Sequence, residues 1–88
     1  MSINIYNAAR GTKNHIKMLV GPNVDLGKLK DPASLKHLNW MLCEICTGRV
    51  TKEKAHRWLG YIQGVLVAQC HMTLDEAKEI NFKAEEKL

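Results

Sequence analysis

Residues 51–69 read TKEKAHRWLGYIQGVLVAQ, and this stretch decides the fold. An apolar stripe at helical spacing, widened by Trp58 and Val65, consists of Ala55, Leu59, Ile62 and Leu66. A second stripe lies roughly opposite and consists of the small residues Gly60, Gly64 and Ala68. A glycine inside a helix costs about 1 kcal/mol relative to alanine, and close approach of another backbone is the usual compensation. We therefore expect this helix to pack on both sides, with the small-residue stripe contacting another helix or a second copy of the chain.

A second helix should precede this one and form a hairpin with it. Asp31 and Pro32 suit a cap and a first helical position, and Gly48 suits a helix end. The apolar residues between them recur at helical spacing: Leu35, Leu38, Leu42 and Ile45. Because the connection to the next cap, Thr51, is short, helices over about residues 32–47 and 52–71 should be antiparallel. This register places Trp40 level with Trp58.

A third helix is predicted near the end of the chain, where residues 73–76 form a capping box. Thr73 can cap the helix while Glu76 reaches back to it. The apolar side of this helix should consist of Leu74, Ala77, Ile80 and Ala84.

The front of the chain, residues 1–30, is less regular. Ile3 and Ile5 alternate with polar residues, as in a short strand, and Thr12 could cap a short helix. We therefore expect one all-α domain over residues 1–88, built on the hairpin, with a C-terminal helix and an irregular or short-helix front.

Composition fits a small globular domain, with 45% apolar and 25% charged residues in 88. The longest apolar run has four residues, Val65–Ala68, so no membrane span or membrane partner is expected. Three cysteines are an odd number, which indicates a reducing, cytoplasmic compartment. The net charge of +4 is concentrated at the front and raises the odds of an anionic partner, and its residues are Arg10, Lys13, Lys17, Lys28 and Lys30. The last 18 residues are acidic in balance.

The thiols and imidazoles do not form a pattern typical of catalysis or metal binding. Cys43 and Cys46 form C-x-x-C near a helix end, where the dipole opposes thiolate formation. Zinc would need four ligands, and Cys70 should lie at the other end of the hairpin. None of the four histidines has a recognised ligand spacing or a nucleophile beside it. We therefore expect no enzyme activity, no catalytic or metal-binding residues and no cofactor.

A basic cluster surrounds the start of the helix at residue 52. Its members are Arg49, Lys52, Lys54 and Arg57. Helix N-termini favour anions, and arginine adds bidentate recognition of phosphate or carboxylate. A solvated helix start explains the same residues, and Glu53 dilutes the charge. Tyr61 should be partly exposed beside the small-residue stripe, where it could join a protein interface.

Residues 56–66 (HRWLGYIQGVL), together with Thr73–Glu76 and Asn81, resemble the C-terminal part of small uncharacterised proteins of tailed bacteriophages. The resemblance covers about residues 54–82. It implies a phage accessory protein made in the cytoplasm of a bacterial host, and such proteins often bind and inhibit a host enzyme. The first hypothesis is therefore a non-enzymatic protein that inhibits a host protein, such as a defence complex or nuclease.

Two other hypotheses remain open from the residues themselves. One is a small-anion or nucleotide-sequestering protein with Arg49, Lys52 and Arg57 around the helix start. The other is a DNA-binding accessory factor, which the apolar character of the helix after Arg57 disfavours. A homo-oligomer formed through the small-residue stripe is compatible with each of them.

Overall fold

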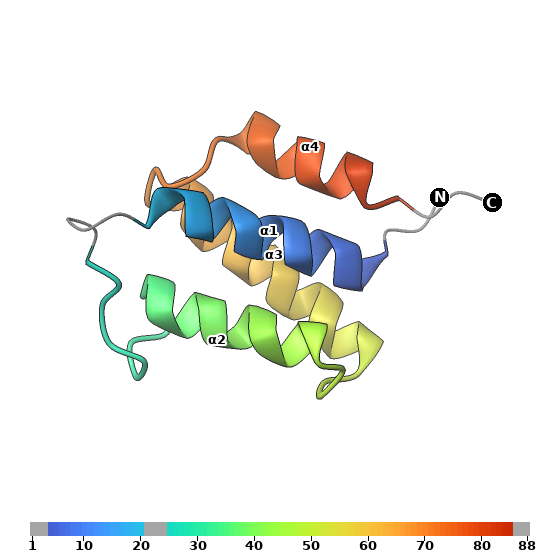
Figure 1. Cartoon of the computed structure of the whole chain (residues 1–88), viewed down its shortest axis with the longest axis horizontal. Helices are drawn as coiled ribbons and strands as arrows, with labels where there is room; N and C mark the ends of the chain where they lie inside the picture. The colour runs from blue at the N-terminus through green and yellow to red at the C-terminus, as the bar shows by residue number, and fades with distance from the viewer. Residues whose placement is uncertain (1–3, 21–24, 86–88) are drawn as a thin grey trace.

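The computed structural model describes residues 4–20 and 25–85, and within them all regular structure is helical. The four helices are α1 (Ile5–Leu19), α2 (Leu35–Cys46), α3 (Lys52–Ala68) and α4 (Leu74–Lys83). Helix α1 lies in front of α3, with α2 along one side and α4 along the other (Figure 1). Helix α1 contacts all three other helices, whereas α2 and α4 do not touch each other. The predicted all-α fold is confirmed.

The core is formed where α1, α2 and α3 meet. Its fully buried side chains include Leu38, Leu42 and Ile45 of α2 and Ile62 and Leu66 of α3. Helix α1 adds a face of mostly small residues, so that it can approach α3 and α4 closely: Ile5, Ala8, Ala9, Thr12 and Ile16. The core thus depends on the front of the chain as much as on the hairpin.

The predicted hairpin between α2 and α3 is present. Thr51 caps α3, and its side chain accepts a hydrogen bond from the backbone N–H of Lys54. Gly48 has a φ of +72°, the left-handed conformation expected for a residue that closes a helix. The rings of Trp40 and Trp58 lie 6.0 Å apart between centroids, which confirms the predicted register.

The front of the chain differs from the expectation of an irregular or short-helix segment. Ile5 is the first residue of a 15-residue helix, not part of a strand, and Ile3 lies outside the described residues. The cap is Asn4, whose side chain accepts from the N–H groups of Tyr6 and Asn7. Thr12 is buried in the middle of α1 and donates to the carbonyl of Ala8. The apolar face of α1 is narrow and rich in alanine, which made its helical period hard to recognise.

Two other boundaries also differ from those predicted, because α3 ends at Ala68 and not near residue 71, and α2 begins later than expected. Asp31 caps a turn, accepting from the N–H of Ala33, and α2 begins after Ser34, whose side chain accepts from the N–H of His37. The capping box of α4 is confirmed, because Glu76 accepts from the N–H of Thr73 at 2.8 Å. Leu74, however, is 59% exposed and does not join the apolar side of α4.

The small-residue stripe of α3 is exposed, and Gly64 and Ala68 line an open groove beside α4. Gly60, Gly64 and Ala68 are exposed, and a Cβ atom added at either glycine would meet nothing within 4 Å. Of the two partners expected for this stripe, another segment of the same chain does not pack on Gly60 or Gly64. Docking of a second copy on this stripe stays a prediction.

Candidate binding surfaces

The predicted basic cluster at the start of α3 is divided among different partners. Arg49 forms an ion pair with Glu44 at 3.2 Å. The Nζ atom of Lys54 lies 5.0 Å from the centroid of the Trp58 ring, a cation–π distance. Lys52 and Arg57 are exposed. Thr51 already satisfies one N–H group at this helix end, so the cluster is a charged rim rather than an enclosed anion cradle.

An aromatic row crosses from α2 to α3 on the outside of the hairpin. The ring centroids of His37 and Trp40 are 5.5 Å apart, and those of Trp40 and Trp58 are 6.0 Å apart, both pairs in tilted orientations. Trp58, expected in the core stripe, packs against the core but is only partly buried. Trp40 is 42% exposed. The row therefore presents indole surface to solvent on a rigid helical base.

The loop before α2 fixes the ends of this row. The hydroxyl of Tyr61, which is 42% exposed as predicted for a partly exposed residue, donates to the carbonyl of Pro32 at 2.8 Å. The Nδ1–H of His37 donates to the carbonyl of Leu29 at 2.7 Å, and the side chain of Leu29 is also exposed. We call the surface formed by Leu29, His37, Trp40, Trp58 and Tyr61 the aromatic face.

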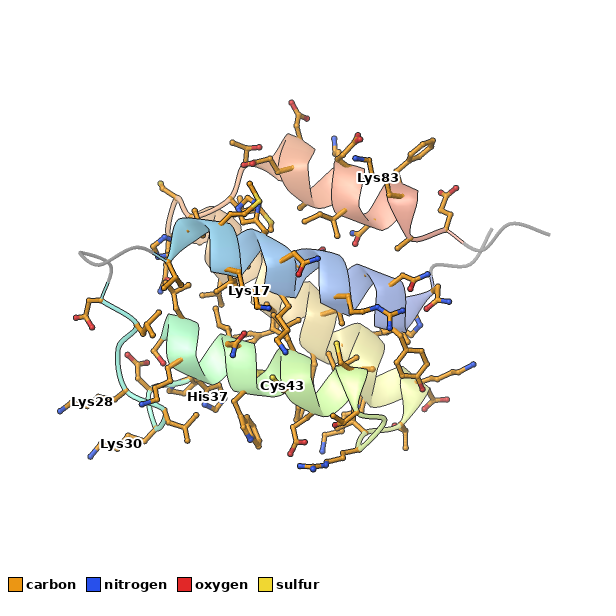
Figure 2. The ribbon with its side chains drawn as sticks, in the orientation of Figure 1. Lys17, Lys28, Lys30, His37, Cys43 and Lys83 are labelled. Carbon is orange, nitrogen blue, oxygen red and sulfur yellow. The ribbon has the colours of Figure 1, made fainter. Side chains whose placement is uncertain are left out.

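A separate groove lies between α1 and α2. It has a volume of about 420 Å³ and is lined by Lys13, Lys17, Lys36 and Asn39 beside three apolar residues: Val20, Leu26 and Leu35. None of these residues is acidic, and α1 contains no acidic side chain. Figure 2 labels Lys17, which lies on the side of α1 that faces α2. We call this surface the lysine groove.

A polar cluster is buried between α1, α3 and α4. The Nε2 of Gln63 donates to Asn81 Oδ1 at 3.0 Å and to Thr12 Oγ1 at 3.2 Å. The Nδ2 of Asn81 donates back to Gln63 Oε1 at 3.0 Å. Because all three groups find partners, the cluster positions α4 on α3 and is structural rather than reactive.

The thiols and histidines do not converge on a reactive centre. Burial raises the pKa of the Cys46 thiol, although nearby Lys13 and Arg10 act in the opposite direction, so Cys46 is a poor nucleophile at neutral pH. Cys43 and Cys46 are partly buried, whereas Cys70 is exposed. Within residues 4–20 and 25–85, no group of three or more His, Cys, Asp or Glu side chains could hold a metal ion.

The lysine groove was missed from the sequence although its signal was there. Lys13 and Lys17 are four residues apart, in a segment whose only charged side chains are basic. Ile3 and Ile5 alternate with polar residues, as in a strand. The sequence therefore did not indicate that Lys13 and Lys17 lie one turn apart on a helix. The sequence placed Trp40 level with Trp58 but did not show that its ring is exposed, because that depends on how the helices pack.

A comparison with known protein families, curated proteins and solved structures finds no match. The resemblance of residues 54–82 to phage proteins therefore stays a prediction. None of the helices in the described part of the chain is long and apolar enough to pass through a bilayer.

Proposed function

We propose that this chain is a non-catalytic binding protein that uses the aromatic face to hold an acidic surface of another protein. The observation that carries the proposal is the partly exposed, pre-ordered row of His37, Trp40 and Trp58, extended by Tyr61. Tryptophan and tyrosine dominate the binding energy of protein interfaces, and they do so best when their rings are already ordered.

The ordering of the face reduces the entropy lost on binding. Tyr61 is held by its hydrogen bond to Pro32, and His37 by its hydrogen bond to Leu29. The Trp58 side chain packs against the core, and the Nζ atom of Lys54 lies over its ring. A partner therefore meets rings that already have their bound orientation.

The charges around the aromatic face indicate which charge the contact surface of the partner should carry. Lys54 and Arg57 are exposed on α3 and outnumber its one acidic residue, Glu53, while on α2 Glu44 is partly buried and paired with Arg49. A cationic rim around an apolar centre favours a partner whose contact surface is apolar at its centre and acidic at its edge.

We further propose that the partner is a host protein whose action is blocked by this chain, a phage accessory protein in the cytoplasm of a bacterial cell. This part rests on the resemblance of residues 54–82, a stretch that includes Trp58 and Tyr61 of the aromatic face. Residues of the predicted basic cluster at the start of α3 then form the edge of this interface.

Affinity purification from a bacterial host, followed by measurement of the dissociation constant with the purified partner, tests the proposal. Trp40→Ala should weaken binding by about 30-fold or more, the effect of removing an interface hot spot of about 2 kcal/mol. Phe82→Ala is the matched control, because Phe82 is an aromatic residue of α4 that is 69% exposed. Its removal should leave binding unchanged, and circular dichroism should show that both variants remain folded at the temperature of the binding measurement.

Equal binding by the Trp40→Ala variant and the parent would contradict the aromatic face as the interface. A partner that binds the Phe82→Ala variant more weakly than the Trp40→Ala variant would place the interface on α4 instead.

A further inference from the structure

The lysine groove is a second surface that the proposed protein interface does not use. Its cations come from two helices: Lys13 and Lys17 lie one turn apart on α1, and Lys36 lies on α2. Among the described residues, none of the three forms an ion pair. Three like charges around one concave surface repel each other, so an anion bound between them would relieve that repulsion.

The rest of the lining is not cationic. Val20, Leu26 and Leu35 give an apolar wall, and Asn39 adds an amide that can both donate and accept hydrogen bonds. A simple inorganic anion would use only the lysines and would leave this wall uncovered. The lining therefore fits a ligand that joins an anionic group to a flat or apolar body with a hydrogen-bonding edge.

We propose that the lysine groove binds a nucleotide, with its phosphates at Lys13, Lys17 and Lys36 and its base against Val20, Leu26 and Leu35. Lysine holds phosphate oxygens as a point charge, which does not require the bidentate geometry of arginine. Asn39 then lies where it can bond to an edge of the base. Nucleotide binding here is independent of the aromatic face and uses none of the residues predicted to bind an anion at the start of α3.

The size of the groove favours a single nucleotide over a nucleic-acid strand. Its volume of about 420 Å³ is in the range of pockets for small ligands, roughly 300–1,000 Å³. A strand needs a basic track several nucleotides long with aromatic side chains for stacking. No aromatic side chain lines the groove, and Lys28 and Lys30 project from the loop at the far edge of the molecule, away from the space between α1 and α2 (Figure 2).

The test is calorimetric titration of the purified chain with four ribonucleoside diphosphates, with pyrophosphate, with adenosine and with a single-stranded decanucleotide. At least one diphosphate should bind with a dissociation constant below about 1 mM. Pyrophosphate should bind at least tenfold more weakly than that nucleotide, because it lacks the base, and adenosine should not bind measurably. The bound nucleotide should also raise the melting temperature.

Charge-neutral variants locate the site. Lys13→Gln, Lys17→Gln and Lys36→Gln should each weaken the nucleotide about tenfold, the loss of one charge-assisted hydrogen bond of about 1.4 kcal/mol. Lys30→Gln and Lys52→Gln change the net charge equally outside the groove and should leave the affinity within about twofold. Because Lys17 and Lys36 are exposed, these variants should keep the parent's fold, which the melting temperature checks.

Four results would overturn the proposal. They are no diphosphate binding below about 1 mM, pyrophosphate binding as tightly as any nucleotide, equal losses in the control and groove variants, and a decanucleotide that binds far more tightly than a nucleotide. A loss confined to Lys52→Gln would instead identify the start of α3 as the anion site.

Discussion

The two long sides of α3 have opposite environments although both are free of charged residues over two turns. The inner side buries Leu59, Ile62 and Leu66 against α1 and α2. On the outer side, Gly60 and Gly64 have no neighbouring atoms within 4 Å of an added Cβ. The difference shows that glycines at a spacing of four do not by themselves indicate a packed surface.

Among the helical glycines Gly11, Gly60 and Gly64, the one that marks a close approach is Gly11 of α1. A Cβ added at Gly11 would lie 2.9 Å from Cγ2 of Ile80, so α4 occupies the space that the missing side chain leaves. Gly11 has no small residue four positions before or after it, so it does not belong to a stripe of small residues that the sequence would indicate. Whether a glycine in a helix marks a packed surface depends on which helix lies next to it. The sequence of one helix alone does not give that information.

The largest effect should come from the inner side of α3. Ile62→Ala should reduce the free energy of unfolding by about 2–5 kcal/mol, because Ile62 is fully buried and its truncation leaves a cavity. Leu74→Ala is the control, since Leu74 is mostly exposed and should cost less than about 0.5 kcal/mol. Urea unfolding of both variants measures the difference. Similar losses would mean that Ile62 is no more important to the core than an exposed leucine of α4, and would contradict its place on the packed side of α3.

The polar part of the inner side should give the next largest effect. Gln63→Leu should cost about 1–3 kcal/mol, because Asn81 and Thr12 lose the partner that satisfies them. Adding Asn81→Leu should recover part of that loss, and a double-mutant cycle measures the coupling. Strict additivity of the two substitutions would contradict the amide pair between α3 and α4.

Gly11→Ala tests the close contact of α1 with α4. Overpacking of this kind costs about 1–3 kcal/mol, which outweighs the gain of up to about 1 kcal/mol from helix propensity. We therefore expect a small net loss, measured by urea unfolding. Combining Gly11→Ala with Ile80→Val, which keeps Cγ2, should not relieve it, whereas Ile80→Ala, which removes Cγ2, should make the alanine favourable. A gain in stability from Gly11→Ala alone would show that α4 is not seated against α1.

The smallest effect concerns the capping hydrogen bonds at the start of α4. The backbone N–H of Thr73, followed by its hydroxyl and nearby His15, lowers the pKa of Glu76 below its ordinary value of 4.5. A lowered pKa means that the stabilisation is present above about pH 4.5 and is lost as the pH falls through the folded-state value. The parent should therefore lose stability between pH 5 and 3 more steeply than Glu76→Gln. Identical pH profiles would show that the capping carboxylate contributes nothing to this loss.

The sequence was sufficient for the hairpin, the cap of α3 and the capping box of α4 because those features are local, whereas the predicted cap at Asp31 was displaced to Ser34. The stripes of α2 and α3, the cap at Thr51 and the box at Thr73 and Glu76 depend on spacing within a few residues, and all are present. The extent of α1 was not predictable in the same way, since its alanine-rich face becomes a packing face only when α3 and α4 are in place. The candidate sites follow this division: Tyr61 was identified from its own helix, whereas the lysine groove needs α1 and α2 together.

The free energy of unfolding of Gly64→Ala tests most directly the claim that α3 has one packed and one bare side. Alanine fits the helical backbone at residue 64 and meets no neighbour, so we predict a gain of about 0.5–1 kcal/mol with an unchanged solution mass. A loss that depends on protein concentration would identify the second copy whose docking on this stripe stays a prediction. A loss that does not depend on protein concentration would show that another segment of the chain covers the glycines, and would contradict the account.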